Sequence, residues 1–264
     1  MKQFLFFILA FIAACFLFAC EKVISVNIDE ADKKLVIEGT VSNNDTIYPQ
    51  VKISQTKNFE DDNSFNGISG AAVIIQVNDT TYTLPETSTG IYQTNAFKGI
   101  PGNTYSLSVL LNGITYTAVS TMPSQIILLD SITVEDLSFA GTTTKTIYPN
   151  YKDPLGFGNS YRLIEYVNGV QVKKAFPQND DFSDGLVVTR PLINADGEIE
   201  SGDTVRVDLQ CIDKAIYKYW FSLDQSATGE SQSATPTNPV TNIVGGALGY
   251  FSAYSVTSRE LIVP

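Results

Sequence analysis

Apolar and polar residues alternate along short segments through most of the chain. This period of two is typical of β-strands with one buried face, and clusters of Gly, Asn, Asp and Ser separate the segments. Asn112-Gly113 and Asn168-Gly169 each join two segments, and Asn-Gly predicts a hairpin because both turn residues take positive φ. We expect strands at residues 35–41, 49–54, 71–77, 80–84, 90–94, 105–111, 114–120, 126–135, 148–151, 161–167, 170–174, 186–189, 204–211 and 251–263.

The first group of expected strands has the spacing of an immunoglobulin-like sandwich, with about seven short strands in roughly a hundred residues. Tyr105 follows Pro101-Gly102 near the start of a late strand, which resembles a tyrosine corner. The stretch 122–125 marks a domain boundary. The sequence therefore predicts a mostly β protein of two tandem β-sandwich-like domains. Residues 34–122 form the immunoglobulin-like one, and 126–264 form a β-rich domain with one short helix.

That helix is expected at residues 214–224, with Asp213 as its N-cap. Four large apolar side chains recur at the spacing of one helical face, and such a face more often packs on a sheet than binds a ligand. They are Ile216, Tyr219, Trp220 and Leu223.

An apolar run at the start of the chain predicts export. The 17 apolar residues Phe4–Cys20 follow the positive Lys2, which is the layout of a secretory signal. A retained membrane span needs roughly 20 apolar residues, so the length of this run is at the lower limit for that alternative. The run ends in Leu17-Phe18-Ala19-Cys20, which resembles a lipobox, the motif whose Cys is acylated and becomes the mature N-terminus.

Cys15 fits the same motif, but polar sequence begins only at Glu21, which favours Cys20 as the lipidation site. We therefore expect a signal peptide at residues 1–19 and a lipid-anchored linker at residues 20–33. The lipid would attach the protein to the outer membrane, and the sequence leaves the membrane face open, periplasmic or surface.

Charge and cysteine content narrow the possible partners. Removing residues 1–19 leaves 16 Lys and Arg against 28 Asp and Glu, a net charge of −12. Such an acidic chain argues against nucleic acid as a partner, because affinity for phosphates comes chiefly from Lys and Arg. With Cys15 removed and Cys20 acylated, only Cys211 remains, so no intramolecular disulfide is expected. Cys211 has the parity of the apolar residues in its strand, which predicts a buried structural thiol.

The composition also excludes several chemistries. The chain has no histidine, which removes Ser-His and Cys-His nucleophile pairs and most zinc sites. A Gly-rich phosphate loop after a strand is absent, because Gly245–Phe251 opens a terminal strand instead. We therefore predict no catalytic residue and no cofactor. A glycosidase with paired carboxylates remains an alternative, because such spacing depends on the folded structure.

Two polar patterns are weak site candidates. Asp180, Asp181 and Asp184 cluster around Gly185 and could offer oxygens to a calcium ion, although Asp-rich turns before strands are common without one. Four Asp-Ser/Thr turns resemble an O-glycosylation acceptor of Bacteroidota envelope proteins, against the simpler reading that Asp-Thr commonly starts a strand. The four turns are Asp45-Thr46, Asp79-Thr80, Asp130-Ser131 and Asp203-Thr204.

Several blocks, in order, carry a resemblance to a known family. They are Cys20-Glu21-Lys22-Val23-Ile24, Leu35-Val36-Ile37-Glu38-Gly39, Asp153-Pro154, Asn159-Ser160-Tyr161-Arg162, Gly202-Asp203-Thr204-Val205, Ile212-Asp213-Lys214-Ala215 and Gly245–Ser255. The set resembles a Bacteroidota lipoprotein family, domain of unknown function 4249, over nearly all of the mature chain. The resemblance supports Cys20 as the acylated residue and implies no catalytic residue. It implies a gene neighbourhood with TonB-dependent outer-membrane receptors, a possible partner.

Three functions are compatible with these features. The first is a non-catalytic accessory lipoprotein of an outer-membrane transporter, and the second is a structural or adhesive surface protein. The third is a hydrolase or metal-dependent enzyme. The loops 59–70 and 229–249 exceed what strand connections need, and long loops are often functional. We expect a docking surface at Asn238–Asn242 with Tyr250 and Phe251.

Overall fold

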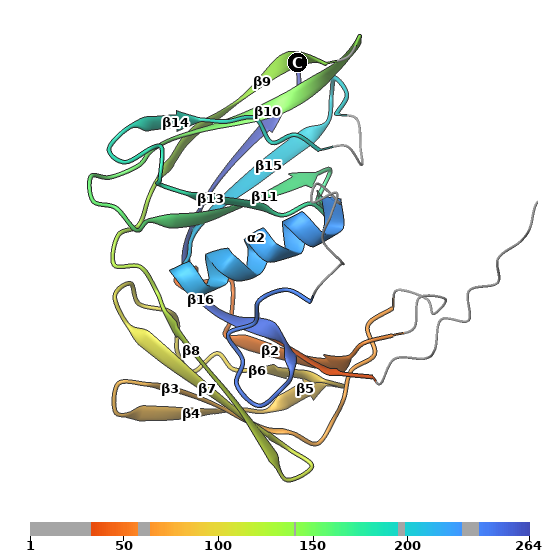
Figure 1. Cartoon of the computed structure of the whole chain (residues 1–264), viewed down its shortest axis with the longest axis vertical. Helices are drawn as coiled ribbons and strands as arrows, with labels where there is room; N and C mark the ends of the chain where they lie inside the picture. Colours follow the sequence, from red (N-terminus) through yellow and green to blue (C-terminus); the bar gives the residue numbers. More distant parts are fainter. Residues whose placement is uncertain (1–32, 58–63, 140, 195–198, 229–237) are drawn as a thin grey trace, which may run out of the picture. The chain divides into compact units, whose positions relative to one another are not determined.

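The computed structural model describes residues 33–57, 64–139, 141–194, 199–228 and 238–264 (Figure 1). The predicted signal peptide, Cys15, Cys20 and the linker through residue 32 lie outside these residues. The strands are β1 (Leu35–Ser42), β2 (Gln50–Gln55), β3 (Ala72–Val77), β4 (Thr80–Leu84), β5 (Glu86–Ser88), β6 (Ile91–Gln93), β7 (Thr104–Leu111), β8 (Ile114–Thr121), β9 (Leu129–Phe139), β10 (Thr142–Lys152), β11 (Ser160–Val167), β12 (Val170–Gln171), β13 (Phe176–Asn179), β14 (Val187–Thr189), β15 (Thr204–Cys211) and β16 (Leu248–Ile262).

The strands form three sheets, which confirms the mostly β, sandwich-like prediction. A nine-stranded sheet has the order β12-β11-β15-β16-β1-β2-β6-β5, with β13 also paired to β11. A four-stranded sheet has the order β4-β3-β7-β8, and a three-stranded sheet has the order β14-β10-β9. Each smaller sheet packs on a different part of the large one, and in Figure 1 they lie at opposite ends of it.

The first sandwich has the strand arrangement of the immunoglobulin class. Strands β1, β2 and β6 face the sheet β4-β3-β7-β8 across one apolar core that includes Ile37, Ile53, Val73 and Val109. The hydroxyl of Tyr105 accepts a hydrogen bond from Ile100 N at 2.7 Å, which confirms the tyrosine corner. The two residues of both Asn-Gly turns take positive φ, as the hairpin prediction requires.

A second core joins the three-stranded sheet to strands β11 and β15. Leu163, Val205, Val207, Leu209 and Cys211 lie on the buried side of the large sheet, because alternate residues of a strand face opposite sides. Cys211 is 3% exposed and its thiol is free, as predicted. Burial raises the pKa of this thiol, which is therefore a structural thiol and not a reactive one.

The last strand, β16, belongs to both sandwiches. Its first half, Leu248–Tyr254, pairs in parallel with β1, and its second half, Ser255–Ile262, pairs antiparallel with β15. Phe251 and Ala253 enter the first core, whereas Val263 just beyond the strand enters the second. The sheet is therefore continuous across the boundary predicted at residues 122–125, and the independence of the two predicted domains stays a prediction.

The helix α2 (Lys214–Thr228) begins where predicted and continues one turn further. Asp213 caps it, because its Oδ1 accepts hydrogen bonds from Ala215 N at 2.9 Å and Ile216 N at 3.0 Å. Its Oδ2 accepts a hydrogen bond from the hydroxyl of Ser120 on β8. The cap therefore also ties the helix to the first sandwich.

Other segments differ from the prediction. The strand expected at 170–174 ends at Gln171, and after the irregular residues 172–175 the chain pairs with β11 again as β13. Within the loop expected at 229–249, residues 229–237 lie outside the described residues, and Ile243 and Ala247 are buried in the first core. The apolar character of these two residues accounts for their burial.

Candidate ligand pocket and docking surface

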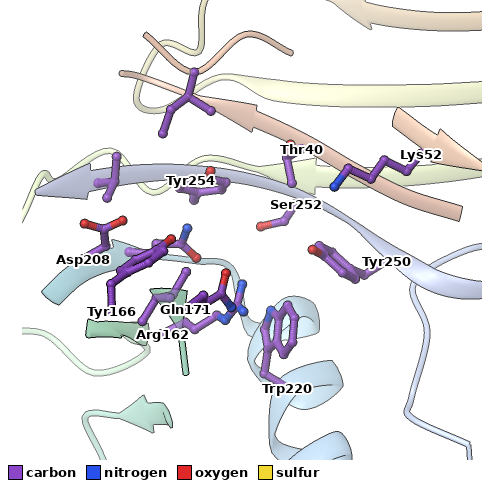
Figure 2. A pocket seen from close by; sticks show the side chains of 14 residues that line it. Thr40, Lys52, Arg162, Tyr166, Gln171, Asp208, Trp220, Tyr250, Ser252 and Tyr254 are labelled. Atoms are coloured by element: carbon purple, nitrogen blue, oxygen red, sulfur yellow. The ribbon is translucent and has the colours of Figure 1, made fainter. Parts of the chain in front are cut away.

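A pocket of about 260 Å³ lies on the large sheet, on the face that also carries α2 (Figure 2). Strands of both sandwiches contribute to it, together with the middle of the helix. The lining residues with polar or aromatic side chains are Thr40, Lys52, Arg162, Tyr166, Gln171, Asp208, Gln210, Trp220, Tyr250, Ser252 and Tyr254.

Strand alternation places these side chains in the pocket. On β11, Leu163 and Glu165 face the second core, so the intervening Arg162, Ile164 and Tyr166 face the opposite side. On β16, the core residues Phe251 and Ala253 alternate in the same way with Tyr250, Ser252 and Tyr254. One continuous sheet therefore brings residues as far apart in the chain as Thr40 and Val256 to a single site.

Arg162 is the central charged group of the pocket. Its guanidinium carbon lies 3.4 Å from the centre of the Trp220 ring, a stacked cation–π arrangement. Trp220 in turn meets Tyr250 edge-on, with ring centres 5.0 Å apart. The Nε of Arg162 is buried and has no hydrogen-bond partner within the described part of the chain. Burial lowers the pKa of Arg162, although an arginine stays charged because its ordinary pKa is far above neutrality.

The other charged groups of the pocket do not neutralise Arg162. The Oδ1 of Asp208 accepts a hydrogen bond from Ser258 Oγ at 2.7 Å and lies 3.2 Å from Arg206 Nε. Lys52 is exposed at the rim and adds a second positive charge. Burial raises the pKa of Tyr250 and Tyr254, so both stay neutral hydrogen-bonding groups near pH 7.

Sequence reasoning missed this pocket. Trp220 was expected to be core, and it does pack on the sheet at 9% exposed, yet it also lines the site. Arg162 stands between apolar residues in the strand Ser160–Val167, and such an interruption is the one local signal of a polar site. The partners of Arg162 could not be found in this way, because they come from distant strands.

The fold brings together two of the three predicted calcium ligands, Asp180 and Asp184, and adds Asp153 to them. Carboxylate oxygens of Asp153, Asp180 and Asp184 lie within 4.8 Å of one another, whereas Asp181 is outside this group and accepts a hydrogen bond from Asn179. Burial raises the pKa of Asp153. A hydrogen bond from the Tyr161 hydroxyl lowers this pKa in part, and the charges of Asp180 and Asp184 raise it further.

This acidic cluster holds two loops together. Asp180 Oδ2 accepts hydrogen bonds from Gly158 N at 2.7 Å and Asn159 N at 2.8 Å. Asp184 Oδ1 accepts one from Gly156 N at 2.6 Å. The carboxylates therefore fasten the loop before β11 to the loop after β13, which is a structural role.

Three apolar side chains project from these two loops, and we call them the apolar loop tip. Leu155, Phe157 and Phe182 are 84%, 78% and 86% exposed. The side chain of Leu155 lies against Gly185 of the other loop, so the two loops are neighbours. Large apolar side chains exposed together are typical of an interaction surface.

The docking surface expected near the C-terminus is wrong in part. Phe251 is fully buried in the first core, and Tyr250 faces the pocket. Val240 and Val244 are exposed, at 56% and 69%. The chain just beyond this segment is held to β8, because Val244 and Thr117 exchange two backbone hydrogen bonds.

The hydroxyl-bearing residues of the candidate glycosylation turns differ in access. Thr46, Thr80 and Ser131 are exposed, and Thr204 is half-buried at the start of β15. Glycosylation at these turns stays a prediction.

Across the described ranges, no helix is long and apolar enough to cross a membrane. Fold and site together define a mostly β protein of two sandwiches that share one sheet, with a polar and aromatic pocket on that sheet. The chain belongs to the family described as domain of unknown function (DUF4249), whose model matches residues 21–260. The resemblance to domain of unknown function 4249 is thereby confirmed, and the Bacteroidota lipoprotein assignment stays a prediction. No curated protein matches the chain.

Proposed function

We propose that this protein is a lipid-anchored outer-membrane lipoprotein that acts as a non-catalytic accessory of an outer-membrane transporter. The observation that carries the proposal is the apolar loop tip. Leu155, Phe157 and Phe182 expose more than three-quarters of their surfaces, and such a cluster gains stability when a partner covers it.

The loop tip is suited to docking because its loops are fastened. The hydrogen bonds from Gly156, Gly158 and Asn159 to the carboxylates of Asp180 and Asp184 hold the backbone beneath the exposed side chains. A surface held in place before binding loses less conformational entropy when a partner docks. This arrangement supports a specific protein contact.

The expected lipid on Cys20 supports a membrane-embedded partner. Confinement to a membrane surface raises the effective concentration of the protein near integral proteins. The gene neighbourhood implied by the family resemblance favours a TonB-dependent receptor among them. The absence of histidine removes Ser-His and Cys-His nucleophile pairs, which favours binding as the function of this β scaffold.

The anchor is tested first. Mass spectrometry of the mature N-terminal peptide should find acylated Cys20 followed by Glu21-Lys22. The matched variants are Cys20→Ala, which should abolish acylation, and Cys15→Ala, which should leave it unchanged. A mature chain that begins at Cys15 would contradict the choice of site, and an uncleaved chain would contradict the anchor itself.

The partner is tested by photo-crosslinking in intact cells of the native host. A photoreactive residue replaces Phe157 or Phe182 in the loop tip, and the control position is Thr83, exposed on the edge strand β4. We expect both loop-tip positions to capture one outer-membrane transporter and Thr83 to capture none. Capture of only peptidoglycan or of further copies of this chain would favour the structural or adhesive alternative.

A further inference from the structure

The pocket around Arg162 leads to an inference about a ligand. We propose that it binds a small molecule that carries a carboxylate, held by the in-plane N–H groups of Arg162. The inference goes beyond the proposed docking function and does not rest on it, because the residues of the pocket and of the loop tip are different sets.

Arg162 has donors to offer. Stacking on Trp220 uses the face of the guanidinium, whereas its N–H groups point outward in the plane of the group. The buried Nε finds no acceptor on any described residue. A buried donor without a partner is costly, and a bound acceptor would remove that cost.

Arg162 also has no salt-bridge partner among the described residues, although the charge of Glu38 on β1 acts on the same two tyrosines, Tyr219 and Tyr250, as that of Arg162 does. The one carboxylate that lines the pocket, Asp208, is already engaged by Ser258 and Arg206. A ligand carboxylate would supply a salt-bridge partner, and the guanidinium fork matches its two oxygens. Lys52 at the rim carries a positive charge, with Glu38 directly opposite it in the β1–β2 ladder.

The donor set favours a carboxylate over a phosphate. Phosphate sites commonly use several backbone N–H groups at a helix N-terminus. Here the first N–H groups of α2 already bond to Asp213, and the pocket is lined by the middle of the helix through Trp220. A single planar guanidinium therefore dominates the site.

Size and lining define the remainder of the ligand. A volume of about 260 Å³ is just below the about 300–1,000 Å³ that is typical of small-molecule sites. Tyr166, Trp220 and Tyr250 give the pocket an aromatic lining, although one face of Trp220 is covered by Arg162 and one face of Tyr166 by Arg206. Thr40 and Ser252 offer hydroxyl groups. The pocket fits an acid with one ring, either a uronic acid or an arylacetic acid.

The chain has one tryptophan, Trp220, so its fluorescence reports directly on the pocket. The purified mature protein is titrated with D-glucuronate and with phenylacetate, each against its neutral counterpart, D-glucose or 2-phenylethanol. Inorganic phosphate is titrated separately. We expect a saturable change with at least one of the two acids, and the responding acid identifies a sugar or an aryl ligand. The neutral compounds and phosphate should produce no change.

Three results would overturn the proposal. One is the absence of a saturable change with either acid up to roughly 10 mM, above the about 1 mM dissociation constant of a weak site. Another is a neutral compound that binds as well as its acid. The third is phosphate that binds as tightly as the better acid.

Variants then test the role of Arg162. Arg162→Lys keeps the charge but loses the fork, so affinity should fall at least about tenfold, whereas exposed Arg259→Gln should leave it unchanged. Lys52→Gln, at an exposed rim position, should weaken binding a few-fold and gives a test even where an Arg162 variant does not fold. Thermal melting shows whether the Arg162 variant is folded. Unchanged affinity in both folded variants would refute the site.

Discussion

Glu165 predicts an unusual dependence of stability on pH. It is fully buried on β11 with its side chain toward the second core, and neither carboxylate oxygen has a hydrogen-bond partner among the described residues. Burial raises the pKa of Glu165 from 4.5 to about 7. Between pH 4.5 and pH 7, Glu165 therefore stays protonated in the folded protein but is ionised in the unfolded chain. The contribution of this group to the free energy of unfolding is therefore largest below pH 4.5. It decreases as the pH rises and reaches a constant, lower value above pH 7.

The magnitude follows from the shift. One pKa unit corresponds to about 1.4 kcal/mol, so the buried carboxylate lowers stability by about 3 kcal/mol at pH 8 relative to pH 4.5. Glu165→Gln keeps the shape but cannot ionise. Denaturant unfolding from pH 5 to 8 should find the variant increasingly more stable than the wild type as pH rises. The difference should reach about 3 kcal/mol above pH 7.

Exposed Glu135 on β9 is the matched control, and Glu135→Gln should change the free energy of unfolding by only a small amount, because the side chain faces solvent. Comparing each variant with the wild type cancels the titration of the other carboxylates. A difference between Glu165→Gln and the wild type that stays constant from pH 5 to 8 would refute the reasoning.

Two further predictions concern the folding of the first sandwich. Gly249→Ala places a methyl group 2.0 Å from Ile37 O at φ +98°, so thermal and denaturant unfolding should find a loss of at least about 3 kcal/mol. Gly246→Ala has a similar φ but open space, and should cost only about 1–2 kcal/mol; equal losses would contradict the clash. Tyr105→Phe removes the hydrogen bonds to Ile100 and should cost about 1–2 kcal/mol, and an unchanged denaturation midpoint would argue against a stabilising corner.

Local features of this fold could be predicted from the sequence because local rules cause them. The Asn112-Gly113 and Asn168-Gly169 turns follow from the φ that these residues accept, and the burial of Cys211 follows from the parity of its strand. The cap at Asp213 follows from its position before an apolar helical face. Each of these signals lies within a few residues of its consequence.

The pairing between distant segments could not be predicted in this way. The parallel ladder of β1 with β16 joins residues more than 200 positions apart, such as Val36 and Leu248, and no local pattern specifies that partner. The pocket depends on this ladder, since it brings Thr40 of β1 and Lys52 of β2 to the same face of the sheet as Tyr250. In the same way, Asp153 joins Asp180 and Asp184 only through the folded loops, and Asp181 next to them does not.

The shared strand β16 also determines the order in which the two sandwiches can fold. A newly made chain emerges from its N-terminus, and domains generally fold as units in that order. Here Phe251 and Ala253, which complete the first core, emerge after all the other strands. The first sandwich therefore waits for the end of the chain with its β1 edge unpaired, and unpaired edges invite aggregation. Until the last strand is released, this edge stays open to unwanted pairing, and loss of the last residues would affect both sandwiches at once.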